Sequence, residues 1–171
     1  MKVKKIVGWA FQLLIIGFVY FLIQFWQSKN MLAVESELPE NQFLLQLVSS
    51  EQTEVVDLAD QHSQTLLYFF APWCQVCHLS IPNLVDLKQQ LTHSGAKTKI
   101  VAIALDYSNK QSVKDFIDQH QVNFPVYYGD VGLRSLFKIS VYPSYYLIDK
   151  NGLVTNRVTG YSSELGMRLR L

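Results

Sequence analysis

The sequence predicts an α/β sandwich whose mixed sheet is closed by an antiparallel hairpin, preceded by one N-terminal transmembrane helix. Three observations predict this class. Residues 6–26 carry no charge, short apolar β-rich runs then alternate with helical patterns, and Asn151-Gly152 separates two strand-like runs near the end. Alternating strands and helices indicate a layered α/β domain. An Asn-Gly pair between apolar runs is the strongest short signal for a hairpin.

The charge-free run from Ile6 to Trp26 is long enough to cross a membrane. Its 21 residues would form a helix of roughly 31 Å, about the thickness of a hydrocarbon core. Three lysines precede the run and one follows it closely, namely Lys2, Lys4, Lys5 and Lys29. Because lysine favours the cytoplasmic side of a membrane, we expect residues 1–5 in the cytoplasm, residues 6–27 as an uncleaved signal anchor, and the remainder outside.

Two other interpretations of this run stay open. A cleavable signal peptide has the same basic start and apolar stretch, although no convincing small-x-small cleavage site follows and Met31-Leu32-Ala33 is a poor one. A buried helix of a soluble core is the second, although core helices rarely lack charge over such a length. Residues 28–40 are polar and acidic and end near Pro39, so we expect a tether there and one folded domain over residues 41–171.

The composition says little about partners. The formal net charge is +1 and the chain has no block of like charges, so nothing indicates binding to nucleic acid. The roughly 130 residues after the tether suit a single domain with one core.

The domain opens with strand-like runs at residues 43–48 and 54–58, and residues 65–70 read as a buried central strand, Thr-Leu-Leu-Tyr-Phe-Phe. A helix is expected after Ala71-Pro72-Trp73, because apolar residues then recur at three- and four-residue spacing. These are Cys77, Ile81, Leu84, Val85 and Leu91. Pro82 lies inside this pattern and should kink the helix, since its ring removes one hydrogen bond.

The second half continues the alternation. Residues 99–105 form the next expected buried strand, and Ser108 with Gln111 suggests a capping box for a helix through His120. A short strand is expected at residues 124–128, and Asp130 should cap a brief helix. The final two strands are expected at residues 144–148 and 153–159, on either side of the hairpin turn.

Cys74 and Cys77 are the only cysteines of the chain and lie one helical turn apart. At the start of a helix, Cys74 meets unpaired backbone N–H groups and the positive end of the helix dipole, which favour the thiolate. We therefore expect Cys74 to be the nucleophile and Cys77 to be the resolving thiol of a redox-active disulfide. Gln75 and Val76, between them, should tune the balance of dithiol and disulfide.

His78 leaves other chemistries open. Cys74-Gln75-Val76-Cys77-His78 also reads as a covalent haem attachment site, although nothing resembles a distal ligand loop. Two thiolates and an imidazole would suit Zn(II) or Cu(I), but a zinc site would need a fourth ligand. A third interpretation makes His78 a redox-tuning residue, because positions four apart share a helix face. The most economical one is a solvated helix residue. His62, His93 and His120 are expected at the surface without a functional role.

Together these motifs resemble the thioredoxin fold. The resemblance is carried by Tyr68-Phe-Phe-Ala-Pro-Trp-Cys-Gln-Val-Cys77, by Pro82, and by Val141-Tyr-Pro-Ser144 before a hairpin strand. The helix after Ser108 and the segment Val122-Asn-Phe-Pro-Val126 are similar to the insertion of TlpA-like membrane-anchored proteins. The ending from Thr159 to Leu171 is similar to the suppressor-of-copper-sensitivity protein D type. The resemblance covers about Asn41 to Leu171 and implies a thioredoxin-like three-layer sandwich.

The resemblance also implies parts of a substrate site. Tyr142-Pro143 would be a cis peptide facing the dithiol, where the backbone of Tyr142 pairs with an extended substrate, and Trp73 would pack beside the cysteines. Two departures stand out, because Tyr68 and Ser80 occupy positions where relatives carry a proton-relaying carboxylate. The general base for Cys77 is therefore unassigned.

The function that follows is a membrane-anchored periplasmic thiol:disulfide oxidoreductase, without a metal or other cofactor. We expect it to reduce disulfides of substrate proteins and to be recycled by a transmembrane electron donor. Roles in copper tolerance, in oxidative stress or in cytochrome maturation are implied by the resemblance. An oxidase or isomerase on the same fold is the first alternative, because the reduction potential depends on small energy differences. A c-type haem protein is the distant one.

Overall fold

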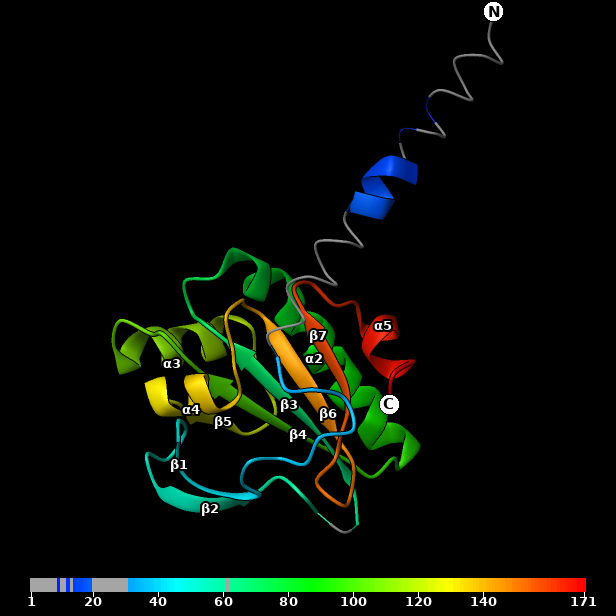
Figure 1. Cartoon of the computed structure of the whole chain (residues 1–171). Helices are drawn as coiled ribbons and strands as arrows, with labels where there is room; N and C mark the ends of the chain where they lie inside the picture. The colour runs from blue at the N-terminus through cyan, green and yellow to red at the C-terminus, as the bar shows by residue number, and fades with distance from the viewer. Residues whose placement is uncertain (1–8, 10–11, 13, 20–30, 61) are drawn as a thin grey trace, which may run out of the picture.

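A mixed sheet forms the centre of the domain (Figure 1). The computed structural model describes residues 9, 12, 14–19, 31–60 and 62–171. In this part of the chain the strand order is β2-β1-β5-β4-β3-β6-β7. β3 pairs in parallel with β4, and β4 with β5, whereas every other pair is antiparallel. The bounds are β1 Gln42–Leu47, β2 Thr53–Asp57, β3 Gln64–Phe70, β4 Thr98–Ala104, β5 Val126–Tyr128, β6 Ser144–Ile148 and β7 Val154–Thr159. The predicted mixed α/β sheet is confirmed.

Helices and a segment of chain cover the two faces of the sheet. The helices are α2 Gln75–Ser94, α3 Lys110–Gln119, α4 Val131–Leu136 and α5 Glu164–Arg168. β3 supplies both cores, because successive side chains of a strand point to opposite faces. Tyr68 and Phe70 pack with α2 and α3, whereas Leu67 and Phe69 pack on the other face with Phe137, which follows α4. The result is a three-layer sandwich with β3 buried on both sides.

Several predicted boundaries shift by one or two residues. The strands β1, β2 and β3 each begin one residue earlier than expected. The predicted capping box at Ser108 and Gln111 is wrong by one position, because the extended Asn109 caps α3 and its side chain accepts from the Ser112 N–H. Asp130 caps α4 as predicted. α2 continues through Pro82 to Ser94.

The hairpin between β6 and β7 forms, but its loop is longer than the two-residue turn that Asn151-Gly152 suggests. The Asp149 carboxylate accepts hydrogen bonds from the N–H groups of Asn151 and Leu153, and Gly152 N–H donates to Asp149 O. Gly152 has φ +84°, a conformation that favours glycine. Asp149 therefore organises the turn, which lengthens the loop to residues 149–153.

The predicted tether needs correction from residue 31 onwards. Met31, Leu32 and Leu38 are buried in the core on the α4 face of the sheet. Hydrogen bonds fasten this segment beside β7, since Glu35 N–H donates to Val154 O and Leu38 N–H donates to Gly152 O. Residues 31–38 thus belong to the folded domain. The acidic and polar residues between them made the segment look solvated, whereas three apolar side chains decide its position.

A chain that begins at residue 41 is expected to be less stable than one that begins at residue 31. Burying an apolar side chain contributes about 1.5–3 kcal/mol, and ordering the backbone offsets part of this gain. We expect the free energy of unfolding to fall by about 3 kcal/mol, measured by urea denaturation of the two chains. Equal urea midpoints would show that this segment contributes nothing.

Most of the predicted anchor, residues 6–27, lies outside the described residues. Residues 14–19 are helical. No helix among the residues that the structure describes has both the length and the hydropathy to cross a bilayer.

Candidate active site

Cys74 lies where β3 leads into α2, at the N-cap of that helix. It has an extended backbone (φ −80°, ψ 110°), and its Sγ accepts a hydrogen bond from Cys77 N–H at 3.3 Å. A thiolate at this position would gain from this donor and from the helix dipole. Both cysteines are thiols in the structure, and Cys77 is fully buried whereas Cys74 keeps 6% of its surface exposed. Cys74 is therefore the thiol that a substrate can reach first.

Cys77 is held as a thiol by its surroundings. Burial raises the pKa of Cys77 far above its ordinary value, and the hydrogen bond with Cys74 raises it further. A hydrogen bond with the backbone of Ala71 opposes this shift. Near neutral pH Cys77 keeps its proton until the chemistry at Cys74 changes this environment. The order that the sequence suggests, with Cys74 attacking and Cys77 following, is consistent with this difference.

The loop before β6 brings Tyr142 and Pro143 against the dithiol. The Tyr142-Pro143 peptide bond is cis, as the resemblance to thioredoxin implies. Cys74 Sγ donates to Tyr142 O over 3.5 Å, and Gly160 N–H donates to Pro143 O at 2.7 Å. The Tyr142 carbonyl thus faces the sulfur at which a substrate disulfide would be attacked.

A network around Asp106 holds Trp73 and Tyr142 in place. Trp73 is 62% exposed, its Nε1–H donates to Asp106 O at 2.8 Å, and its ring meets Tyr142 edge-on with centroids 5.9 Å apart. The Tyr142 hydroxyl donates to Asp106 Oδ2 at 3.0 Å, and Arg134 of α4 lies 3.0 Å from the same oxygen. Burial raises the pKa of Tyr142, and the bond to Asp106 adds to this effect. The phenol therefore stays a donor.

Asp106 and Arg134 are not among the site residues that the sequence predicts. Asp106 has φ +48°, which is uncommon for a residue other than glycine and costs about 1 kcal/mol or more. One signal was available, because Asp106 directly follows the expected strand at residues 99–105. The carboxyl ends of parallel strands meet at one edge of a sheet, where ligands bind.

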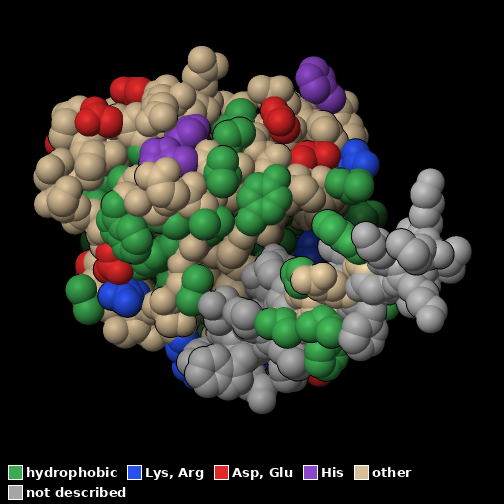
Figure 2. Space-filling view, turned by 90° about the horizontal axis from the view of Figure 1, so that it is seen from above, with side chains coloured by type: hydrophobic (Ala, Val, Ile, Leu, Met, Phe, Trp, Pro, Cys, Tyr) green, Lys and Arg blue, Asp and Glu red, His purple; other side chains and the backbone are tan. Residues whose placement is uncertain are grey.

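Exposed apolar side chains lie on the first turns of α2, and others lie on α5 and the segment that leads into it, where α5 packs against α2. Val76 and Leu79 are 38% and 67% exposed, and Tyr161 and Leu165 are each 50% exposed. Figure 2 looks onto the upper end of Figure 1 and shows hydrophobic side chains gathered in the middle of that face, with histidine at their border. Gln75 is also exposed on the first turn of α2. Apolar surface of this kind suits contact with another polypeptide.

His78 and His120 lie together, although the sequence predicts no role for His120. His78 Nδ1 is 2.7 Å from His120 Nε2, and His78 Nε2 is 2.9 Å from Pro72 O. Burial lowers the pKa of His120, and the positive charge of His78 lowers it further. Local spacing could not reveal this pair, because 42 residues separate the two rings along the chain.

Tyr68 and Ser80 form a buried polar layer below Cys77. The Tyr68 hydroxyl has no hydrogen-bond partner among the described residues, whereas Ser80 Oγ exchanges hydrogen bonds with Ser162 N–H and O, both at 3.4 Å. Burial raises the pKa of Tyr68 well above its ordinary value, although neighbouring Ser80 opposes the shift. The phenol therefore stays protonated in the neutral range and does not supply the carboxylate that the resemblance implies for this position.

Replacing Tyr68 with phenylalanine is expected to keep or increase stability. A buried hydroxyl without a partner costs about 1–3 kcal/mol, so its removal should raise the free energy of unfolding by about 1 kcal/mol. Urea denaturation of the Tyr68→Phe variant measures this change. The matched control is Tyr146→Phe, because the Tyr146 hydroxyl donates to Phe137 O at 2.7 Å and its loss should destabilise the domain. A loss of stability in Tyr68→Phe equal to that of the control would contradict this assignment.

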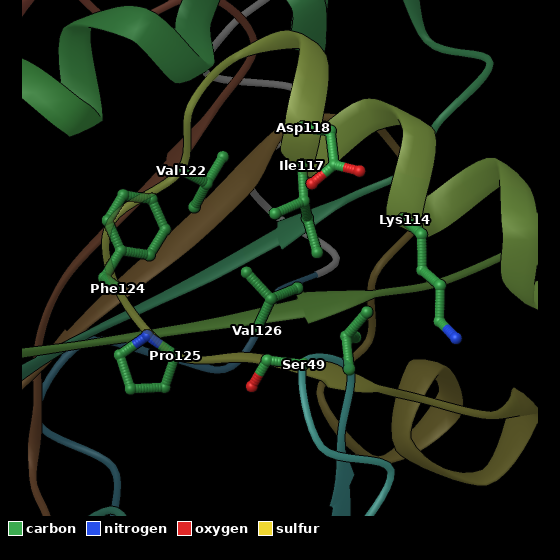
Figure 3. Close-up of a pocket in the computed structure, with 9 residues that line it drawn as sticks. Ser49, Lys114, Ile117, Asp118, Val122, Phe124, Pro125 and Val126 are labelled. Carbon is green, nitrogen blue, oxygen red and sulfur yellow. The ribbon is translucent and has the colours of Figure 1, made fainter.

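A separate cavity of about 370 Å³ lies between α3 and the strands β1 and β5. Figure 3 shows its lining, in which Ile117 and Val126 point toward one another and the charged ends of Lys114 and Asp118 point away from them. The lining residues are Val48, Ser49, Lys114, Ile117, Asp118, Val122, Phe124, Pro125 and Val126. None of them is a residue predicted for the redox site, so we do not assign this cavity to the dithiol.

The geometry does not favour covalent haem attachment. Cys77 is fully buried, so a thioether bond to a haem would require the domain to open. Neither ring nitrogen of His78 is free to bind iron, because Nδ1 contacts His120 and Nε2 contacts Pro72 O. Within the described ranges, no group of three or more His, Cys, Asp or Glu side chains is placed to hold a metal ion.

Comparisons with known proteins identify the same chemistry. The thioredoxin-like protein YneN of Bacillus subtilis is 22% identical over 168 residues, covering 98% of this chain and 97% of YneN. The thiol-disulfide oxidoreductase ResA of Oceanobacillus iheyensis is 33% identical over 121 residues, covering 69% of this chain and 62% of ResA. The crystal structure of StoA from Bacillus subtilis superimposes with a TM-score of 0.67 at 22% identity, covering 79% of this chain and 98% of StoA.

Fold and site together define a thiol–disulfide oxidoreductase of the thioredoxin fold. A sequence profile of the AhpC/TSA family matches residues 34–157. The chain belongs to the AhpC/TSA family, and its similarity to ResA and StoA supports the TlpA-like group within the thioredoxin-like proteins. The narrower assignment to the suppressor-of-copper-sensitivity protein D type stays a prediction.

Proposed function

We propose that this chain is a membrane-anchored periplasmic enzyme that reduces disulfides in substrate proteins. The observation that carries the proposal is the position of Cys74. Its sulfur lies at the surface end of α2 against Tyr142 O, and the buried Cys77 lies one turn behind it. An extended substrate segment that pairs with the Tyr142 backbone would bring its disulfide to Cys74.

The reaction follows from this order of thiols. The Cys74 thiolate attacks one sulfur of the substrate disulfide, forms a mixed disulfide and releases the other substrate sulfur as a thiolate. Cys77 then loses its proton and attacks Cys74 Sγ, which forms the Cys74–Cys77 disulfide and releases the second substrate thiolate. Two electrons pass to the substrate. A transmembrane electron donor with a dithiol of its own would return the Cys74–Cys77 disulfide to the reduced state.

Reduction is the direction that we propose, with oxidation or isomerisation on the same fold as the alternative. The relative with the highest identity among those compared above carries the name thiol-disulfide oxidoreductase ResA, and the same chemistry run backwards would make an oxidase or isomerase. The anchor and the periplasmic location are supported by the charge-free residues 6–26 and by the lysines before them. A role in copper tolerance, in oxidative stress or in cytochrome maturation belongs to the same proposal.

The proposed function is tested by trapping substrates with the Cys77→Ala variant of the full chain. Without the resolving thiol, the mixed disulfide on Cys74 should accumulate with envelope proteins and disappear on treatment with dithiothreitol. The matched control is Cys74→Ala with Cys77→Ala, which leaves no thiol and should trap nothing. If the single variant forms no more adducts than the control, the proposal fails.

The location is tested separately on the unaltered chain. We expect it in the membrane fraction, with its thiols open to a membrane-impermeant maleimide in intact cells whose outer membrane has been permeabilised. Labelling that requires lysis of the inner membrane would place the dithiol in the cytoplasm and refute the proposed orientation.

A further inference from the structure

The imidazoles of His78 and His120 form a chain of contacts that ends at the active-site loop. His78 comes from the first turns of α2, and His120 is the C-cap of α3. The chain runs from His120 Nε2 to His78 Nδ1 over 2.7 Å, and from His78 Nε2 to Pro72 O over 2.9 Å. Pro72 lies two residues before Cys74. Histidine side chains lie on the face that Figure 2 shows, next to its hydrophobic centre.

The carbonyl at the end of the chain fixes where the protons are. Pro72 O can only accept, so His78 Nε2 must carry a proton. In neutral His78 the other nitrogen, Nδ1, then accepts, and His120 Nε2 must be the donor across the 2.7 Å contact. This leaves His120 Nδ1 as the basic nitrogen through which the neutral pair takes up a proton.

The two imidazoles can take up one proton together, but a second proton is unfavourable. The lowered pKa of His120, which burial and the charge of His78 cause, opposes a second proton. When His120 Nδ1 takes up a single proton, the Nε2 proton can pass along the existing hydrogen bond to His78 Nδ1. The charge then reaches α2, four residues from Cys74 in the sequence.

Few charged groups near the two imidazoles can interact with this positive charge. The Phe116 ring packs against both imidazoles, with centroids 4.7 Å from His78 and 4.8 Å from His120. Asp115 of α3 lines the same cavity as His78, and its carboxylate accepts from Gln111 Nε2 at 2.7 Å. The other charged groups of α3 have partners or positions elsewhere, since Lys110 Nζ donates to Gln46 Oε1, Lys114 pairs with Glu51, and Asp118 lines the cavity between α3 and β5. Asp86, Lys88 and His93 lie further along α2. At the start of α2 the other titratable groups are the Cys74 and Cys77 thiols. His78 lies one helical turn after Cys74, and its backbone N–H donates to Cys74 O at 3.2 Å, so the Cys74 thiolate is the group that we expect a cation on His78 to stabilise.

We propose that His120 is a positioning residue that supplies, through His78, a positive charge beside Cys74 when the Cys74 thiolate forms. The proposal rests on the proposed function of Cys74 as the attacking thiol. Protons balance, because Cys74 gives one proton to solvent and the pair takes one from solvent at His120 Nδ1. The thiolate is therefore supported below neutral pH, and the pair releases its proton when Cys74 becomes part of a disulfide.

The test is the pH profile of Cys74 alkylation by iodoacetamide, measured in the full chain with Cys77→Ala so that one thiol reacts. His120→Gln keeps an amide donor for His78 Nδ1 but cannot carry a charge. At pH 6 we expect this variant to react about threefold more slowly than the parent, corresponding to about half a pKa unit of coupling, and at pH 8.5 the two rates should coincide. His93→Gln, an exposed change near the end of α2, should follow the parent throughout.

Two results would overturn the proposal. Superimposable profiles of parent and His120→Gln exclude a charge effect, and an equal slowing at every pH indicates a structural effect alone. NMR of the unaltered chain gives a readout that needs no variant, since the His120 ring should titrate at higher pH in the dithiol form than in the disulfide form. Equal titration in both forms overturns the proposal as well. Because alkylation needs no substrate protein, failure of the proposed reductase function would leave this result unaffected.

Discussion

Replacing Cys74 with alanine is expected to abolish the reduction of protein disulfides. The buried Cys77 remains as the only thiol, and its raised pKa keeps it protonated near neutral pH. A protonated, inaccessible thiol cannot begin the exchange, because the thiolate is the nucleophile. We expect kcat/KM for a disulfide-containing protein substrate to fall by on the order of 10³-fold or more, measured by the turbidity of reduced insulin with dithiothreitol as electron donor.

The Cys77→Ala variant separates the role of the attacking thiol from that of the resolving thiol. It should also lose turnover, but it should still form one mixed disulfide per chain with oxidised glutathione, visible by mass spectrometry. Cys74→Ala should form none under the same conditions. The assignment of roles is wrong if Cys74→Ala forms the adduct and Cys77→Ala does not.

Replacing Asp106 with alanine is expected to impair both substrate binding and stability. The change removes the acceptor of the Tyr142 hydroxyl and the partner of Arg134, and alanine must then adopt φ +48°. The hydrogen bond to a charged group contributes about 1.5–3 kcal/mol, whereas the partly exposed ion pair contributes at most about 1 kcal/mol. We expect the free energy of unfolding to fall by about 2 kcal/mol.

The functional effect of this change should fall on KM. Tyr142 and Trp73 lose their common anchor, so the KM for a protein disulfide should rise about fivefold, corresponding to about 1 kcal/mol, with a smaller change in kcat. Asp106→Asn is the matched control, because asparagine tolerates positive φ and keeps an oxygen for the Tyr142 hydroxyl. Its KM should lie close to the unaltered value. If Asp106→Ala leaves KM unchanged, the network does not position the substrate site.

The sequence allowed the central part of the fold to be predicted because its signals are local. Phe69 and its neighbours in β3 form an uninterrupted apolar run, and the spacing from Cys77 to Leu91 marks the buried face of α2. The position of the dithiol at the end of β3 follows from these two elements. The cis peptide before Pro143 followed from the resemblance, since composition and spacing do not indicate it.

Features that depend on distant contacts were not predictable in the same way. Met31 and Leu32 look like part of a polar tether until β7 is placed beside them, where Arg157 donates to both of their carbonyl oxygens. His120 looks like a helix-surface residue until α3 packs beside α2. Asp106 gains its role only when the loops carrying Trp73 and Tyr142 meet it. Each of these required the tertiary arrangement.

The most direct test of the central claim is the redox equilibrium of the unaltered domain. The protein is equilibrated in glutathione buffers of graded ratio, and the fraction of dithiol is measured by alkylation and mass spectrometry. We predict one reversible two-electron transition that joins Cys74 to Cys77, with a midpoint near that of thioredoxin, about −270 mV. A midpoint well above the glutathione couple, near the value of about −120 mV known for a strong oxidant, would contradict a reductase. The absence of any reversible transition would contradict the redox dithiol itself.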